Sequence, residues 1–348
     1  MVRALLLSAL SALAGVLPAG AFAGETPREA LNRLWPDYVA AFTTQEGRVV
    51  DNGNGAITHS EGQGYALLLA AETDDRPVFD RLFAFTRSTL MIREDGLAAW
   101  VYDPELGHVR DRNNATDGDL LIAYALIEGG ERWDDAALRF AARRMTRALL
   151  DGTVSVAGER QILLPGASGF DAEARTDGPV VNLSYYVFPA FRALSELDPQ
   201  ARFDVLERDA LALMEESRFG PRGLPSDWVA LGGEAPQPAE GFDPIFGYDA
   251  IRIPLYLAWA GAGQRQHLAP FVAEWSETPP SIVWVADGSV RSAFAENGYR
   301  AVAALVACVM NGTPPDPALF QRLDPLYYPA TLQLLSLLAL DERQEACP

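Results

Sequence analysis

The sequence is poor in the residues on which metal and nucleophile chemistry most often depends. It contains three histidines and two widely separated cysteines, and no His-Glu-x-x-His motif occurs. Such a set cannot supply the ligands of a zinc site. The Gly-x-Ser-x-Gly motif, the P-loop and a dinucleotide-binding Gly-x-Gly-x-x-Gly motif are also absent, which argues against the enzymes that use them. We therefore expect no metal and no other cofactor.

Lysine is missing altogether. All 28 basic residues are arginine, against 47 acidic residues, and the net charge is −19. An acidic surface of this size repels phosphate backbones, so we expect no nucleic-acid partner. Anionic lipids and anionic polysaccharides are disfavoured for the same reason, whereas neutral and cationic partners remain open.

Long apolar runs are confined to the N-terminus. Met1–Ala23 carries a single charge, an apolar run over Ala4–Leu17 and a small-x-small sequence at Ala21-Phe22-Ala23. This pattern predicts a secretory signal peptide, too short and wrongly flanked for a membrane span. No later stretch of 18 or more residues is apolar. We expect a secreted chain, periplasmic or extracellular, without membrane insertion, in which residues 24–348 form one domain.

Cys308 and Cys347 leave an alternative open. In an exported protein an even pair permits one disulfide. Cys308 lies in the apolar run Leu305–Met310, where a buried free thiol would fit equally well.

Helical periodicity dominates the mature chain. Thr26-Pro27-Arg28-Glu29 is a capping box before apolar residues at helical spacing as far as Phe42, and Ser60-Glu61-Gly62-Gln63 predicts a second one, opening a helix through Thr73. Further helices are predicted at 77–90, 117–128, 135–150, 184–196, 204–217, 249–262, 266–276, 296–311, 316–322 and 326–341. A hairpin is expected at Thr153–Leu164 and a Gly/Pro-rich loop at Arg222–Pro238.

Twelve helices without a linker or a fixed repeat favour a toroid of paired helices over a solenoid or a simple bundle. If the even-numbered helices form a parallel inner ring, their N-termini meet at one end of the barrel. These helices begin near Glu61, Asp117, Asn182, Asp249, Glu296, Asn297, Tyr299, Tyr327 and Tyr328. We therefore predict a cleft lined by carboxylates and aromatic rings, which are the groups that cleave glycosidic bonds and stack on sugars.

The first block with candidate chemistry is His59-Ser60-Glu61-Gly62-Gln63-Gly64-Tyr65. Two glycines in a first helical turn cost about 1 kcal/mol each in helix propensity. Close approach of a ligand to the backbone is one explanation for them. Alternatively, Glu61 only complements the helix dipole at an exposed N-terminus.

Two further blocks contain acidic residues. In Asn113–Asp119, Thr116 is predicted to cap a helix with Asp119 as its partner, which leaves Asp117 without a local role. The spacing lacks the pattern of a calcium loop. In Tyr248–Arg252 the side chains of Asp249 and Arg252 share a helix face, as a surface ion pair or as an enclosed pair with a function.

Together these blocks resemble glycoside hydrolase family 8 over nearly all of the mature chain. They are most similar to the periplasmic endo-β-1,4-glucanases associated with bacterial cellulose synthesis. Supporting segments are Gln45–Val49, Ala99-Trp100, Leu164-Pro165-Gly166, Gly169-Phe170, Asn182-x-Ser184-Tyr185 and Ser226-Asp227-Trp228-Val229. One departure is Ala66-Leu67, where the family commonly has Gly-Met; it alters packing rather than chemistry.

The resemblance implies an all-α (α/α)6 barrel, with an open cleft, that hydrolyses β-1,4-glucosidic bonds of cellulose or a related β-glucan by inversion. It implies Glu61 as the general acid, Asp249 as the general base and Asp117 as the residue that binds and distorts the sugar at the cleavage point. The implied substrate-binding residues are Trp100, Asn182, Tyr185, Arg252 and Tyr328, with Arg252 also positioning the base.

Other functions remain as alternatives. The family resemblance also covers xylan, lichenan and chitosan, and the acidic surface keeps cationic chitosan open. A protein of a different class, a non-catalytic glucan-binding component of an export complex, would lack one of the two carboxylates of the acid–base pair. A helical interaction scaffold would show sequence repeats. We expect a monomeric endo-acting enzyme, with the cellulose synthase complex as a candidate partner.

Overall fold

The computed structural model of the protein describes residues 24–263 and 265–347. The expected signal peptide, Met1–Ala23, lies outside the described residues. Within them, a search for a helix with the length and hydropathy needed to span a bilayer finds none.

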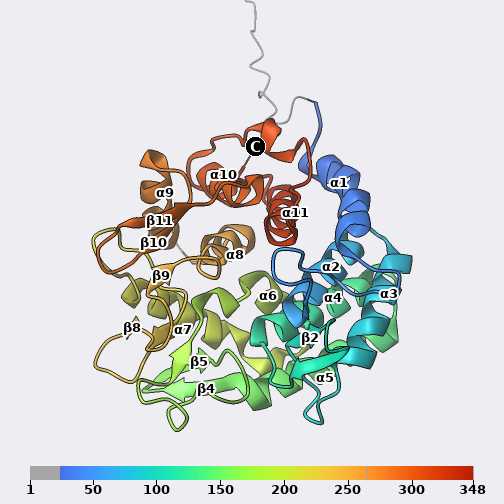
Figure 1. Cartoon of the computed structure of the whole chain (residues 1–348), viewed down its shortest axis with the longest axis horizontal. Coiled ribbons are helices and arrows are strands. Elements are labelled where there is room, and N and C mark those ends of the chain that lie inside the picture. The colour runs from blue at the N-terminus through green and yellow to red at the C-terminus, as the bar shows by residue number, and fades with distance from the viewer. Residues whose placement is uncertain (1–23, 264, 348) are drawn as a thin grey trace, which may run out of the picture.

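The described residues contain eleven α-helices arranged in two concentric rings (Figure 1). The inner ring consists of α2 (Ser60–Glu72), α4 (Thr116–Arg132), α6 (Phe188–Leu197), α8 (Arg252–Ala260), α10 (Asn297–Asn311) and α11 (Tyr327–Glu342). Each inner helix contacts the next, and α11 contacts α2, which closes the ring. The predicted (α/α)6 barrel is thereby confirmed.

The outer ring consists of α1 (Pro27–Phe42), α3 (Arg76–Phe85), α5 (Ala136–Thr153), α7 (Phe203–Glu216) and α9 (Arg265–Glu277). Outer helices α1, α3, α5 and α7 bury one stripe, whereas α2, α4, α8 and α11 are buried almost all round, as expected for helices enclosed by others. α1 packs against α11, so the first and last helices of the chain are neighbours (Figure 1).

Four helix predictions are wrong in part, among them the one at 77–90, where α3 ends at Phe85 and Thr86–Leu90 is a π-helix. The predicted helix at 316–322 is a four-residue 3-10 turn, Pro317–Phe320. The predicted helix at 184–196 starts at Phe188 after a separate 3-10 turn, and the one at 249–262 starts at Arg252. Pro189 and Pro254 lack an N–H, and both lie in the first turn of their helices, where that N–H would have no intrahelical partner.

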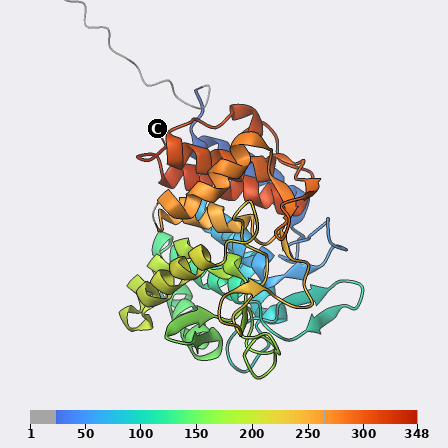
Figure 2. The ribbon, with the colours of Figure 1, turned by 90° about the vertical axis from the view of Figure 1, so that its left-hand side faces the viewer.

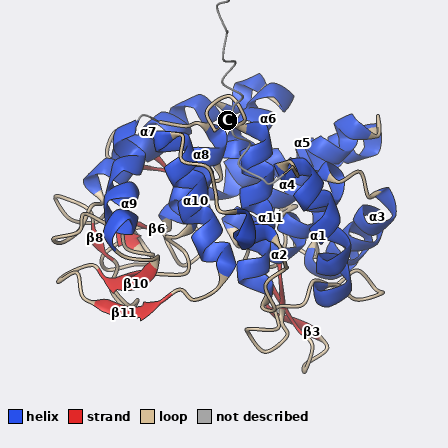
Figure 3. Cartoon of the chain, turned by 90° about the horizontal axis from the view of Figure 1, so that it is seen from above, coloured by secondary structure: helices blue, strands red, loops and turns tan. Residues whose placement is uncertain are grey.

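Short strands gather where the inner helices begin. The sheets are β1 (Thr58–His59), β2 (Val101–Asp103) and β3 (His108–Asp111); β6 (Val180–Val181), β7 (Val229–Ala230) and β8 (Gln237–Pro238); β9 (Ile245–Phe246), β10 (Ser281–Trp284) and β11 (Val290–Ala293). Strands β1, β6 and β9 lead into α2, α6 and α8. Figures 2 and 3 show long loops and hairpins on one side of the helices.

The hairpin predicted at Thr153–Leu164 is confirmed by β4 (Val154–Ala157) and β5 (Arg160–Leu163), which pair antiparallel. The segment predicted as the loop Arg222–Pro238 instead contributes β7 and β8 to a sheet. These strands are two residues long, and β7 also pairs with the distant strand β6, which local periodicity cannot reveal.

Cys308 of α10 and Cys347 form a disulfide, which settles the alternative left open by the sequence. The bridge closes a loop with a sequence separation of 39 residues. Replacing both cysteines by alanine should lower the free energy of unfolding by about 4 kcal/mol, because the bridge restricts the unfolded chain. Urea denaturation of the double variant, beside wild type with and without reductant, measures this. Equal unfolding free energies would contradict it.

Candidate active site

Three inner helices bring three carboxylates onto one arginine. Arg252, at the start of α8, is 1% exposed, and its Nη1 donates to Glu61 and to Asp117, the latter at 2.9 Å. Its Nη2 donates to Asp249 at 2.9 Å. Glu61 and Asp117 lie 191 and 135 residues away along the chain, so only the fold could assemble this group. The predicted convergence of these helix starts is confirmed.

The carboxylates differ in access to solvent. Glu61 and Asp249, with side chains 16% and 31% exposed, line a cavity of about 450 Å³. Its walls also include Asp51, His59, Tyr248, Glu296, Tyr299 and Tyr328. Asp117 is 1% exposed and lies beneath Glu61 on the same guanidinium nitrogen. Of the three carboxylates on Arg252, the cavity therefore presents two to a ligand and keeps the third behind them.

Crowding of the carboxylates changes their proton affinity. Burial, and then the charge of Glu61, raise the pKa of Asp117 to about 7 against the opposing effect of Arg252. Burial also raises the pKa of Asp249, which Arg252 and a hydrogen bond from Asn182 counteract. Asp117 therefore retains a proton in part of the molecules near neutral pH, although Arg252 lies beside it. A proton-carrying carboxyl close to an ionised one is the requirement of general acid–base catalysis.

Glycines set how closely α2 and α4 approach. A Cβ on Gly118 would lie 2.2 Å from Ser60 Oγ and 2.7 Å from the backbone nitrogen of Glu61. A Cβ on Gly64 would lie 2.5 Å from that of Leu121. Of the two glycines near Glu61, Gly64 is thus explained by its contact with α4, whereas a Cβ on Gly62 would lie 2.8 Å from the hydroxyl of Tyr327; both are explained by packing rather than by ligand approach. The contact between α2 and α4 places Glu61 beside Asp117.

The helix that carries Glu61 is capped differently from the prediction. His59 is the N-cap, and its Nδ1 accepts the N–H of Gly62 at 3.0 Å while Nε2 faces Asp51 at 3.3 Å. Gln63, predicted as the partner in a capping box, instead accepts the N–H of Val49 at 2.6 Å. The residue after the strand therefore caps α2, and Gln63 ties the helix to a neighbouring loop.

The cap predicted for α4 is also wrong. Thr116 donates to the carbonyl of Leu164 at 2.6 Å, and Ala115 is the N-cap without a side-chain bond. Asp119 accepts from the N–H of Ala98 at 2.7 Å and from Asn114 at 2.9 Å. These side chains join α4 to two loops, because buried polar groups find partners wherever the fold supplies them.

The predicted substrate-binding residues fall into two groups. Asn182 donates to Asp249 at 3.0 Å, and the ring centre of Tyr185 lies 5.7 Å from the guanidinium carbon of Arg252. Tyr328 lines the cavity and donates to the carbonyl of Tyr248 at 2.6 Å. These three surround the carboxylates.

Trp100 lies beside the cavity. Its carbonyl accepts the N–H of Ser60 at 2.9 Å, and its indole donates to Asp111 at 2.9 Å. The arrangement keeps Trp100 near the start of α2, outside the set of residues that line the cavity.

Three residues of the site had no role assigned from the sequence. Asp51 and His59 line the cavity next to Glu61, and Asp227 bonds to the turn that carries Asp249. His59 and Asp227 belong to sequence segments that were already singled out. Their roles could not be predicted, because their contacts are with residues far away in the chain. Within residues 24–263 and 265–347, no group of three or more acidic, histidine or cysteine side chains is placed to hold a metal ion.

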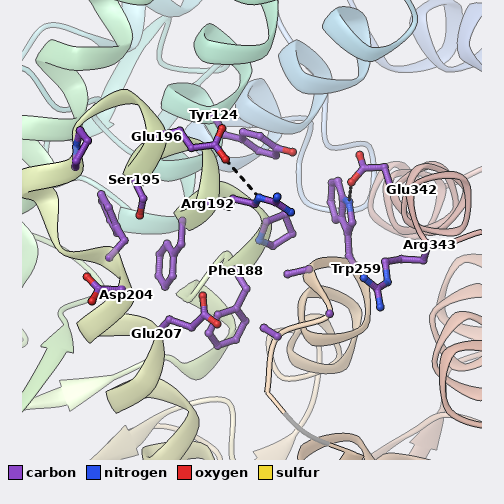
Figure 4. A pocket seen from close by; sticks show the side chains of 17 residues that line it. Tyr124, Phe188, Arg192, Ser195, Glu196, Asp204, Glu207, Trp259, Glu342 and Arg343 are labelled. Atoms are coloured by element: carbon purple, nitrogen blue, oxygen red, sulfur yellow. Dashed lines mark hydrogen bonds and ion pairs between the residues drawn. The ribbon is translucent and has the colours of Figure 1, made fainter. Parts of the chain in front are cut away.

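A second hollow, of about 720 Å³, lies where the inner helices end (Figure 4). There Trp259 donates to Glu342 at 2.7 Å, and Arg192 pairs with Glu196 at 3.4 Å. These carboxylates are held by separate partners, unlike the three on Arg252. The acid–base candidate is therefore the cavity at the opposite end.

Comparison with known proteins agrees with this geometry. A family model described as glycosyl hydrolases family 8 matches residues 9–341. An endoglucanase from Cellulomonas uda is 40% identical over 258 residues, 74% of this chain and 70% of that one. A probable endoglucanase from Novacetimonas hansenii is 37% identical, covering 93% and 94%. The structure of the endo-β-1,4-glucanase CMCax from Acetobacter xylinum superposes with a TM-score of 0.83 at 35% identity, covering 91% of this chain and 99% of that one.

Proposed function

The chain belongs to glycosyl hydrolase family 8, and we propose that it cuts β-1,4-glucan internally by inversion, with Glu61 as general acid and Asp249 as general base. The observation that carries this is the assembly on Arg252. Glu61 and Asp249 bind different nitrogens of one guanidinium and face the same cavity. Inversion requires two carboxyls on opposite sides of a bond, with room for a water between base and sugar.

The reaction follows from these positions. Glu61 donates its proton to the glycosidic oxygen as the bond to the anomeric carbon breaks. Asp249 accepts a proton from a water that attacks that carbon from the opposite face, so the new hydroxyl is α. Asn182 and Arg252 each donate to one oxygen of Asp249, which fixes the direction of its free lone pairs.

Asp117 has two roles in this proposal. Its carboxyl shares Nη1 of Arg252 with Glu61, and two carboxyls so close cannot both ionise without repulsion. A proton is thereby kept near the glycosidic oxygen. The family resemblance also assigns Asp117 to holding the distorted sugar, which requires the substrate to reach past Glu61, because the side chain of Asp117 is 1% exposed. Trp100, Tyr185 and Tyr328 are assigned to sugar contacts on the surrounding walls.

The substrate and setting complete the proposal. Because its relatives are endoglucanases, we assign cellulose or a related β-1,4-glucan as the substrate. The signal-peptide pattern of Met1–Ala23 supports export to the periplasm or beyond. The resemblance to glucanases of cellulose synthesis supports action on newly made cellulose, with the synthase complex as a partner.

The assay that tests this function compares reducing-sugar release from carboxymethylcellulose, lichenan, xylan and chitosan. We expect a rapid fall in carboxymethylcellulose viscosity with few new ends, as internal cutting requires. Proton NMR during cleavage of cellopentaose should show the α-anomer first. Initial release of the β-anomer would contradict inversion, and activity confined to xylan or chitosan would contradict the glucan assignment.

A further inference from the structure

Asp227, which lies outside the cavity, is bonded to both sides of the turn that carries Asp249. Its Oδ1 accepts the N–H of Gly247 at 2.8 Å and the N–H of Ala250 at 2.8 Å. Its own N–H donates to the carbonyl of Ile245 at 2.7 Å. One buried residue thus holds the chain before and after Tyr248-Asp249.

The turn has other supports, but none of them binds the N–H groups of Gly247 and Ala250: Tyr328 donates to the carbonyl of Tyr248 at 2.6 Å, and the N–H of Ile251 bonds to the carbonyl of Gly247 at 3.2 Å. The N-cap of α8, Ile251, supplies no side-chain hydrogen bond. Within the turn, the N–H of Arg252 bonds to the carbonyl of Asp249 at 3.1 Å, and that of Ile253 bonds to Ala250 at 3.0 Å. The N–H groups of Gly247 and Ala250 are buried and would have to find other partners if Asp227 were absent.

Gly247 gives the carboxylate access to this turn. A Cβ at position 247 would lie 2.6 Å from Asp227 Oδ2 and 2.9 Å from the Cδ1 of Ile245. Any larger residue would push the carboxylate away from the two amides. Gly247 and Asp227 therefore act as one unit.

We propose that Asp227 is a positioning residue for Asp249, acting through the backbone of residues 247–250 without touching the substrate. The inference rests on the proposed role of Asp249 as general base. Its chemistry is simple: an accepting oxygen at position 227 fixes the turn, and the turn fixes the direction of the base and of Arg252 beside it.

The surroundings of Asp227 disfavour the ionised form of its carboxyl group. Asp227 is 8% exposed. Burial and the charge of Asp249 raise the pKa of Asp227 to about 7, although its two amide bonds and Arg252 favour ionisation. An asparagine at this position could accept both N–H bonds without adding a second negative charge near the base. The geometry therefore predicts that Asn, but not Ala, substitutes for Asp227.

Steady-state kinetics on cellopentaose test this. Asp227→Ala should lower kcat by about 100-fold, because a displacement of the base near 1 Å has that effect, with little change in KM. Asp227→Asn should restore kcat to within about fivefold of wild type, since it keeps the hydrogen-bond acceptor. Gly247→Ala should resemble Asp227→Ala, and adding it to Asp227→Ala should cause little further loss, because coupled residues are not additive.

Asp209→Ala is the matched control. Asp209 is also 8% exposed and accepts a backbone N–H, that of Gln161 at 2.8 Å, but joins α7 to the β4–β5 hairpin away from the site. It should lose stability and keep kcat. A wild-type kcat in Asp227→Ala, or equal losses in the Ala and Asn variants, would overturn the positioning role.

Two measurements keep the result interpretable. Thermal unfolding shows which variants are folded, and if Asp227→Ala is not, Gly247→Ala tests the same contact with the carboxylate retained. Asp249→Asn separates this inference from the proposed function. If that variant is active, the base assignment fails; if it is inactive while both Asp227→Ala and Gly247→Ala are fully active, only the positioning role fails.

Discussion

Replacing Glu61 by Gln is expected to lower kcat on unactivated cello-oligosaccharides by roughly 10²–10⁴-fold, the usual contribution of a general acid. Gln keeps the size of the side chain and an oxygen that can accept from Arg252, but it has no proton to give to the glycosidic oxygen. Binding of cellopentaose, measured by calorimetry, should be nearly unchanged. Kinetics and calorimetry on the same preparation therefore separate catalysis from affinity.

The leaving group offers a more specific test of the acid. An aryl cellobioside with a strongly acidic phenol needs no protonation as it departs. Glu61→Gln should therefore lose much less rate on that substrate than on cellopentaose. Glu131→Gln is the matched control, because Glu131 is exposed in the last turn of α4, at the other end of the barrel. An equal loss on both substrates would argue for a structural role of Glu61.

Replacing Asp249 by Asn is expected to lower kcat by a comparable 10²–10⁴-fold, because the attacking water then has no proton acceptor. The wild-type rate should fall at low pH as Asp249 is protonated. Because the pKa of Asp249 is raised above its ordinary 3.8, this loss should begin at a higher pH than for a free aspartate. Rates measured between pH 3 and 8 would give the pH at which this loss of activity begins.

A small nucleophile can separate a missing base from a damaged fold. In Asp249→Ala, azide can enter the space of the carboxylate and attack without giving up a proton, forming the α-glycosyl azide. Asp37→Asn, on the exposed side of α1, should behave as wild type. A variant of Asp249 that keeps most of its rate on cellopentaose, or an azide product of β configuration, would end the assignment of Asp249 as base.

The parts of the fold that could be predicted from the sequence are those governed by local spacing. Apolar periodicity located the inner and outer helices to within a few residues, and the capping box at Thr26 is present as predicted. Glu61, Asp117 and Asp249 were predicted to lie together because we assumed that alternate helices form a parallel inner ring. The N-termini of these helices then meet at one end of the barrel.

What could not be predicted depends on contacts between distant segments. Nothing near Arg252 in the chain shows that it also binds Glu61 and Asp117. Gln63 and Thr116 have good capping sequences, yet each bonds to a different loop. A buried polar group takes the partner that the fold supplies, and tertiary contacts override local preference. Asp227 was overlooked for the same reason.

The contact between the first and last helices has a consequence for how the protein is made. Arg28 of α1 bonds to Asp341 of α11 at 2.8 Å, across 313 positions, and Tyr38 bonds to Thr331 at 2.9 Å. Until the final helix has been synthesised, α1 lacks the helix against which it packs most extensively, and a contact between residues so far apart in the chain forms slowly. The ring of inner helices and the contact between its two ends are therefore completed only after the last helix has been synthesised.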